Sequence, residues 1–194
     1  MFNRIGWEKS VSKTKLISLA LASVAFTGLV HGTPVLAASQ GSLGPTSSGS
    51  VSITASVPNR ARISGLTDVS FLNQDPATAA SAAQNVCVWS NTATKAYTVT
   101  ASGNGTANAF TLSNGSSTVP YSVAWASSIN QTSGTALATG TASASLTSTA
   151  TNQTCASGPV ASASLIVGIS TTDLGTMSAG SNYLGTLTLL ITPQ

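Results

Sequence analysis

Apolar and small polar residues alternate along most of this chain, and this alternation restricts the fold more than any other feature. Successive side chains of a strand point to opposite faces, so a period of two predicts strands with one buried and one hydroxyl-rich face. Residues 50–57 show the pattern most clearly, and Pro58 ends it because proline cannot donate to a ladder. The apolar face of this stretch consists of Val51, Ile53, Ala55 and Val57.

Short strands recur along the rest of the chain. The pattern predicts them at 61–63, 69–71, 85–89, 96–101, 110–112, 119–125, 161–169 and 184–191, with weaker candidates near Leu137 and Leu146. Asn104-Gly105 and Asn114-Gly115 indicate turns, since both residue types tolerate positive φ. After residue 37 we find no convincing apolar period of 3.6 residues. Many short strands divided by Gly and Asn favour an all-β fold, either a sandwich or a barrel.

The first 37 residues have the three parts of a secretory signal peptide. An uncharged stretch at 16–30 is followed by small residues at 35–37 that a signal peptidase accepts. A membrane anchor is the alternative, but the apolar run of about 15 residues is shorter than the roughly 20 that a bilayer core needs. We therefore predict cleavage after residue 37 or 38, and export to the cell surface, the extracellular space or the periplasm. The basic residues of the leader are Arg4, Lys9, Lys13 and Lys15.

Removal of the leader leaves a chain without net charge. The whole chain carries a formal +3, but four of its seven basic residues and one of its four acidic residues lie in residues 1–37. The mature chain therefore has no electrostatic footprint for nucleic acid, and we expect no membrane association after cleavage. It fits one domain, residues 50–194, preceded by a flexible segment at 38–49. Its charged residues are Arg60, Arg62, Lys95, Asp68, Asp75 and Asp173.

Two cysteines remain after cleavage, Cys87 and Cys155. In an exported protein an even pair most simply forms one disulfide. The bridge would close a loop of about 69 residues, for which the chain-entropy model gives roughly 4 kcal/mol of stabilisation. Metal ligation is the alternative, but neither cysteine has a histidine or a second cysteine at ligand spacing.

The mature chain lacks the side chains of common catalytic sites. His31 is the single histidine and Glu8 the single glutamate, and both leave with the leader. A Ser-His-Asp triad, a Cys-His pair and a zinc hydrolase site therefore cannot be assembled. Lys95 is most simply an exposed strand lysine. We predict no enzyme, no catalytic residue, no metal and no cofactor. The three aspartates, Asp68, Asp75 and Asp173, stand in turn-like contexts where Asp commonly bonds its own backbone.

Four aromatic residues leave a binding role open. Side chains of this kind on alternating strands are more often core than surface, but together they could form a platform on which sugars stack. The alternative function is therefore a monomeric secreted or periplasmic binding module, possibly for glycans. The residues are Trp89, Tyr97, Tyr121 and Trp125.

Several segments resemble the spore coat protein U-like family of exported bacterial domains, which is related to the subunits of archaic chaperone–usher pili. The similar segments are 50–57, the cysteine strand 85–88, the stretch 119–123 and the ending 180–189, which reads Gly-Ser-Asn-Tyr-Leu-Gly-Thr-Leu-Thr-Leu. One feature departs from the pilins. Their strand after the N-terminal segment often bears the first cysteine, whereas residues 60–63 here read Arg-Ala-Arg-Ile.

The resemblance implies an immunoglobulin-like antiparallel β-sandwich that lacks one strand, which the N-terminal segment of a neighbouring subunit supplies. Val51, Ile53, Ala55 and Val57 would then be donor-strand residues. The alternative is that 50–57 is an ordinary first strand of its own domain. The implied partners are identical or related subunits and a periplasmic chaperone. We therefore predict a structural or adhesive subunit of a fimbria-like surface assembly.

Overall fold

The computed structural model describes residues 37–194, so the predicted leader lies almost entirely outside the described residues. The chain divides into two units, one ending at Ala55 and one comprising Ser56–Gln194. In the first unit, Ser39 and Ser50 form an antiparallel bridge with backbone N–H to carbonyl distances of 2.9 and 3.0 Å. This bridge closes residues 39–50 into a loop.

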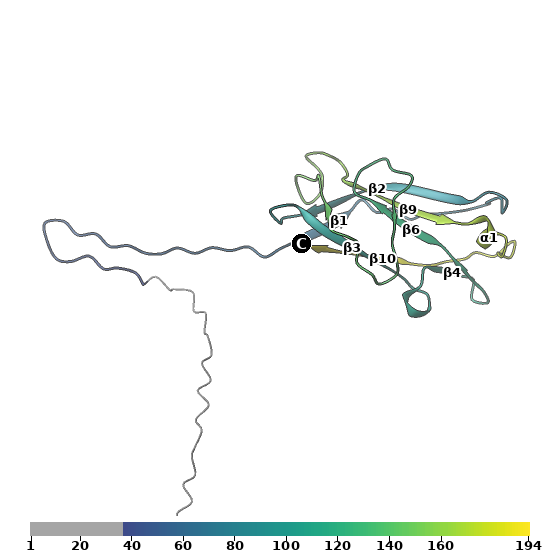
Figure 1. The fold of residues 1–194 in the computed structure, drawn as a ribbon, viewed down its shortest axis with the longest axis horizontal. Coiled ribbons are helices and arrows are strands. Elements are labelled where there is room, and N and C mark those ends of the chain that lie inside the picture. Colours follow the sequence, from purple (N-terminus) through teal and green to yellow (C-terminus); the bar gives the residue numbers. More distant parts are fainter. Residues whose placement is uncertain (1–36) are drawn as a thin grey trace, which may run out of the picture. The chain divides into compact units, whose positions relative to one another are not determined.

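Residues Ser56–Gln194 form a β-sandwich in which every strand pairing is antiparallel. The predicted all-β, immunoglobulin-like antiparallel fold is confirmed. Figure 1 shows the strands, with α1 at one end of this unit and the C-terminus at the other. One sheet has the order β1 (Ala61–Ser64), β2 (Ala80–Ser90), β9 (Ala163–Ile169), β6 (Ser122–Ala126), β7 (Thr135–Ala136). The other has the order β10 (Leu187–Pro193), β3 (Ala96–Gly103), β8 (Leu146–Thr147). A separate hairpin joins β4 (Thr111–Ser113) to β5 (Thr118–Pro120).

The core lies between the two sheets. Val86 and Val88 of β2, and Tyr97 and Val99 of β3, are completely buried. Trp125 of β6 is also buried, and its indole N–H donates to the Tyr97 hydroxyl at 3.3 Å, so the largest polar groups of the core satisfy one another. Burial raises the pKa of the Tyr97 hydroxyl, and the hydrogen bond from Trp125 partly offsets this effect.

Strand 161–169 of the prediction becomes β9, but its predicted polar face is buried as well. Ser164 is completely buried because the segment after β6 covers it. Its hydroxyl donates to the Ser128 carbonyl at 2.9 Å and accepts from the Gln131 N–H at 3.1 Å. Both faces of the strand Ala163–Ile169 are therefore packed against other parts of the protein, and neither is a solvent face.

Three further expectations need correction. The predicted strand 119–125 is two strands, β5 and β6, separated at Tyr121. Residues 69–71 form no strand, because no neighbouring strand offers them a ladder there. Besides a 3₁₀ turn at Thr106–Asn108, the described residues also include one turn of α-helix, α1 (Thr171–Leu174), in which the Ser170 hydroxyl accepts from the Asp173 N–H at 3.1 Å and caps the N-terminus. One turn is too short to produce an apolar period of 3.6.

Residues 51–57, predicted as a strand, form no ladder with any described strand. A strand needs a partner for its backbone groups, and β1 begins only at Ala61, after Pro58. Both interpretations of residues 51–57, a donated strand and an ordinary first strand of its own domain, therefore stay predictions.

Candidate functional site

The segment at residues 51–57 exposes its apolar side chains. Val51, Ile53 and Val57 are 72, 87 and 81% exposed. Ala55 is exposed too. An exposed row of apolar side chains at every second position usually marks an interaction site, because burying such a row is favourable.

β1 and β10 are edge strands, and each has one edge without a strand partner among the described residues. β1 pairs only with β2, and β10 pairs only with β3. The half-buried inward row of β10 comprises Leu187, Leu189 and Ile191. Unpaired edges can accept a further strand, and natural proteins usually cover or charge them.

A groove of about 1210 Å³ lies beside the first half of β10 and is lined by residues between 66 and 189. The segments that lead away from β1 and into β10 form its walls. Buried core side chains form its floor, so the interior of the sandwich is open at this position. The floor residues are Tyr121, Leu165, Val167, Ile169 and Leu174. The apolar wall residues are Leu66, Val69, Phe71, Leu72, Met177, Tyr183, Leu184, Leu187 and Leu189.

Tyr121, one of the floor residues, carries a buried hydroxyl without a hydrogen-bond partner in the described part of the chain. Its side chain is only 8% exposed and packs on Phe110, with ring centroids 5.6 Å apart. The hydroxyl oxygen has no hydrogen-bond partner among the described residues, and burial raises its pKa. A buried hydroxyl without a partner costs about 1–3 kcal/mol, so a ligand that offers a carbonyl here would gain from accepting its proton.

Tyr183 fixes one wall of the groove. Its hydroxyl lies 2.9 Å from the Ser117 hydroxyl on the β4–β5 hairpin and accepts the Ser178 N–H at 3.1 Å. Backbone bonds between Ser113 and Leu184, at 2.8 and 2.9 Å, attach the same wall to β4. The hydrogen bond with Ser117, and then those from Ser178, lower the pKa of the Tyr183 hydroxyl. The resemblance pointed to this ending, but not to its role as a groove wall.

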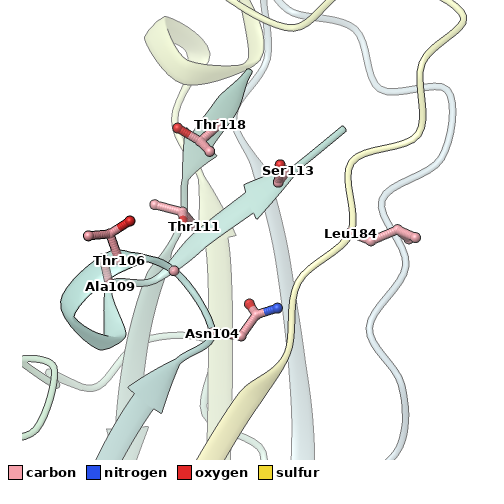
Figure 2. Close-up of a pocket in the computed structure, with 8 residues that line it drawn as sticks. Asn104, Thr106, Ala109, Thr111, Ser113, Thr118 and Leu184 are labelled. Carbon is pink, nitrogen blue, oxygen red and sulfur yellow. The ribbon is translucent and has the colours of Figure 1, made fainter. Parts of the chain in front are cut away.

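A smaller cavity of about 310 Å³ lies at the other side of β4 (Figure 2). Asn104 accepts the Thr186 N–H at 3.0 Å and connects the end of β3 to the start of β10. The chain bends at Asn104-Gly105 as predicted, but Gly105 has an ordinary φ of −73°, so positive φ is not the reason for the turn. Gly105 serves close packing, because a Cβ there would lie 2.1 Å from the Thr111 hydroxyl oxygen. The turn at Asn114-Gly115 is confirmed, with Gly115 at φ +90°. The cavity lining contains no charged or aromatic side chain, so this feature reflects turn packing.

The structure does not bring the candidate catalytic residues together. Asp75 caps a turn by accepting the Ala77 N–H at 2.9 Å, and Asp173 lies in α1. Asp68 is exposed beside the groove. Lys95 is not a strand residue but lies in the turn before β3, with φ +53°. Within residues 37–194 no group of three or more His, Cys, Asp or Glu side chains could hold a metal ion.

The aromatic residues proposed for sugar stacking are mainly core. Tyr97, Tyr121 and Trp125 are 0, 8 and 2% exposed. Trp89 is half-buried and packs against the disulfide. The four side chains therefore do not form a shared exposed platform.

The disulfide between Cys87 and Cys155 is confirmed, with an S–S distance of 1.99 Å and a Cα–Cα distance of 6.0 Å. Both cysteines are buried and contact Ala150 in a small cluster apart from the main core. The bridge attaches the segment before β9 to the middle of the five-stranded sheet.

No protein-family model matches this chain, and no curated protein matches it significantly. The resemblance given above therefore stays a prediction. In the part of the chain that the structure describes, we find no helix long and apolar enough to span a membrane.

Proposed function

We propose that this protein is a structural subunit of a fimbria-like surface assembly that is built by strand addition. The observation that carries the proposal is an open, largely apolar groove beside the unpaired edge of β10, in a chain that also exposes an apolar segment of alternating pattern. A protein with both features can donate a strand to one neighbour and accept a strand from another.

The dimensions of the segment suit the groove. Residues 51–57 span about 20 Å when extended, at about 3.3 Å per residue. β10 covers seven residues, Leu187–Pro193, so its free edge has a comparable length. An added strand would bond this edge through its backbone, and every second side chain would enter the groove. Ser52, Thr54 and Ser56 would then face solvent, as their hydroxyls favour.

The groove also has the chemistry of an incomplete core. Its floor and walls are mainly apolar, and the single unsatisfied hydroxyl among them, that of Tyr121, needs an acceptor. A strand supplies backbone carbonyls at regular spacing, whereas a purely apolar ligand would leave the Tyr121 hydroxyl unsatisfied. In an exporting cell a periplasmic chaperone would cover the groove until a subunit replaces it.

The test compares two substitutions on opposite faces of the donor segment in the exported protein. Ile53→Asp places a charge on the face that enters the groove, and Thr54→Asp places the same charge on the solvent face. Both sites lie in a segment without ladder contacts, so we expect neither substitution to change the folding of the sandwich. The oligomeric state is measured by size-exclusion chromatography with light scattering.

We expect the wild type and Thr54→Asp to assemble, and Ile53→Asp to remain monomeric. The burial of a side chain the size of isoleucine contributes about 1.5–3 kcal/mol, and burial of an aspartate without a partner reverses that gain. A wild type that stays monomeric at all concentrations, or equal assembly of the two variants, contradicts the proposal.

A further inference from the structure

The six charged side chains of the sandwich are divided between its two ends. Arg62 of β1 pairs with Trp89, and the backbone of Arg60 bonds Asn91 directly after β2 ends. Lys95 lies in the turn that connects the end of β2 to β3. All three cations therefore lie at the end of the domain where β2 finishes, here named the basic end.

The three anions lie toward the opposite end. Asp75 lies in the turn that leads into β2 at Ala80. Asp173 follows β9, whose last residue, Ile169, pairs with Ala80. Asp68 follows Thr67, whose N–H donates to Gln84 at 2.7 Å. Asp75 and Asp173 lie at the end of the domain where β2 begins, whereas Asp68 lies between that end and the middle of β2. The three residues together are named the acidic end, and Figure 1 shows the C-terminus and α1 at opposite ends of the domain.

The separation of the two ends follows from the length of β2. Its ten residue steps from Ala80 to Ser90 span about 33 Å at about 3.3 Å per residue. The Debye length at physiological ionic strength is about 8 Å, so the charges of one end act nearly independently of the other. Gln194 also lies at the basic end, bonded to Ala96, and a free carboxylate there would offset one of the three cations.

The groove and the point where the chain enters the sandwich lie at different ends as well. The groove extends along the half of β2 and β9 nearer to Ala80 and Ile169, and Asp68 is one of its lining residues. The chain enters the sandwich through Pro58 and Arg60, both held by Asn91 at the basic end. A copy that places residues 51–57 in the groove can thus bring its own Arg60 and Arg62 to the acidic end of the acceptor.

We propose that the basic end of one copy and the acidic end of the next are complementary contact surfaces, which orient the donated strand in the groove. Residue 57 then leaves the groove at the acidic end. The reverse orientation would bring the basic end of the donor against the basic end of the acceptor. Complementary charge of this kind mainly affects association rate and orientation, and salt weakens it. This inference rests on the proposed function, and its partner is a second copy of this chain.

The test uses two synthetic peptides and a full-length acceptor whose groove stays free. One peptide has the sequence of residues 50–62, and the other carries Arg60→Gln and Arg62→Gln. The acceptor is the Ile53→Asp protein, which by the proposed function cannot donate a strand. Dissociation constants are measured by titration calorimetry at 20 and 500 mM NaCl.

We expect the arginine peptide to bind about tenfold tighter than the glutamine peptide at 20 mM NaCl, and nearly equally at 500 mM. Asp68→Lys in the acceptor leaves a weaker negative charge at the acidic end and should remove most of the preference at low salt. Asp68→Glu keeps the charge and should keep the preference. Both substitutions are at an exposed site, so the fold should survive them.

The remaining outcomes contradict either the charge inference alone or the proposed function with it. Equal binding of both peptides at low salt, or an unchanged preference in Asp68→Lys, overturns the charge inference and leaves the proposed function standing. Failure of both peptides to bind at any salt concentration contradicts strand acceptance itself, and the charge inference falls with it.

Discussion

Replacing both cysteines by alanine should remove a large part of the stability of the sandwich. The bridge joins residues separated by 68 positions, and the chain-entropy model assigns such a loop about 4.4 kcal/mol at 25 °C. Cys87 and Cys155 are 3 and 2% exposed, so the loss of both sulfur atoms also leaves a small void, worth about 1 kcal/mol. We therefore expect Cys87→Ala/Cys155→Ala to lower the free energy of unfolding by about 4–5 kcal/mol.

This loss is large beside the total stability of about 5–15 kcal/mol typical of a domain. For a sandwich of this size it corresponds to a fall of the melting temperature by about 10–20 °C. Urea and thermal unfolding followed by circular dichroism measure the effect, with the wild type in the presence of reductant as a second comparison. Reductant should destabilise the wild type and leave the double variant unchanged.

Two results would refute this reasoning. One is a loss below about 1 kcal/mol, which would mean that the bridge barely restricts the unfolded chain. The other is the detection of two free thiols in folded wild-type protein purified without reductant.

Three further substitutions test other parts of the structure. Tyr121→Phe should leave the unfolding midpoint of the monomer nearly unchanged or raise it, because the Tyr121 hydroxyl has no hydrogen-bond partner there. The same substitution should weaken binding of the 50–62 peptide about fivefold in calorimetry. Gly103→Ala should lower the free energy of unfolding by about 2 kcal/mol or more in urea melts, because its Cβ would lie 2.0 Å from the Ala109 carbonyl oxygen; an unchanged midpoint would contradict the close packing. Ser162→Ala should cost about 1–3 kcal/mol in the same assay, since the Ser162 hydroxyl accepts the buried Val88 N–H at 2.8 Å; Ser128→Ala, at an exposed serine, is the control.

The alternation of the sequence was sufficient to predict most strands, because a period of two depends only on local geometry. It could not predict that Ser164 is buried, since the segment at 128–131 covers it from a distance in the sequence. The same limit applies to 51–57, whose pattern indicates a strand but not the chain that pairs with it.

The groove could not be predicted either, for a different physical reason. Its walls are irregular segments, near Leu66–Leu72 and Met177–Leu184, that have no periodicity to read. Their apolar residues resemble ordinary loop residues in the sequence, and only their convergence around one groove in the folded chain makes them a candidate site. The cysteine pair, in contrast, was predictable because two cysteines allow a single connectivity.

The low charge of the sandwich gives the position of each charge more weight. Among the described residues, the buried hydroxyls of Ser148, Ser162 and Ser164 each donate a hydrogen bond to a backbone carbonyl. The six charged side chains are therefore not needed to satisfy the interior, and they lie at the two ends. In the proposed assembly, attraction between copies would therefore be concentrated where the donor segment leaves one copy and where the groove of the next copy opens. Contacts between ends are then favoured over contacts between flanks, as strand addition from one copy to the next requires.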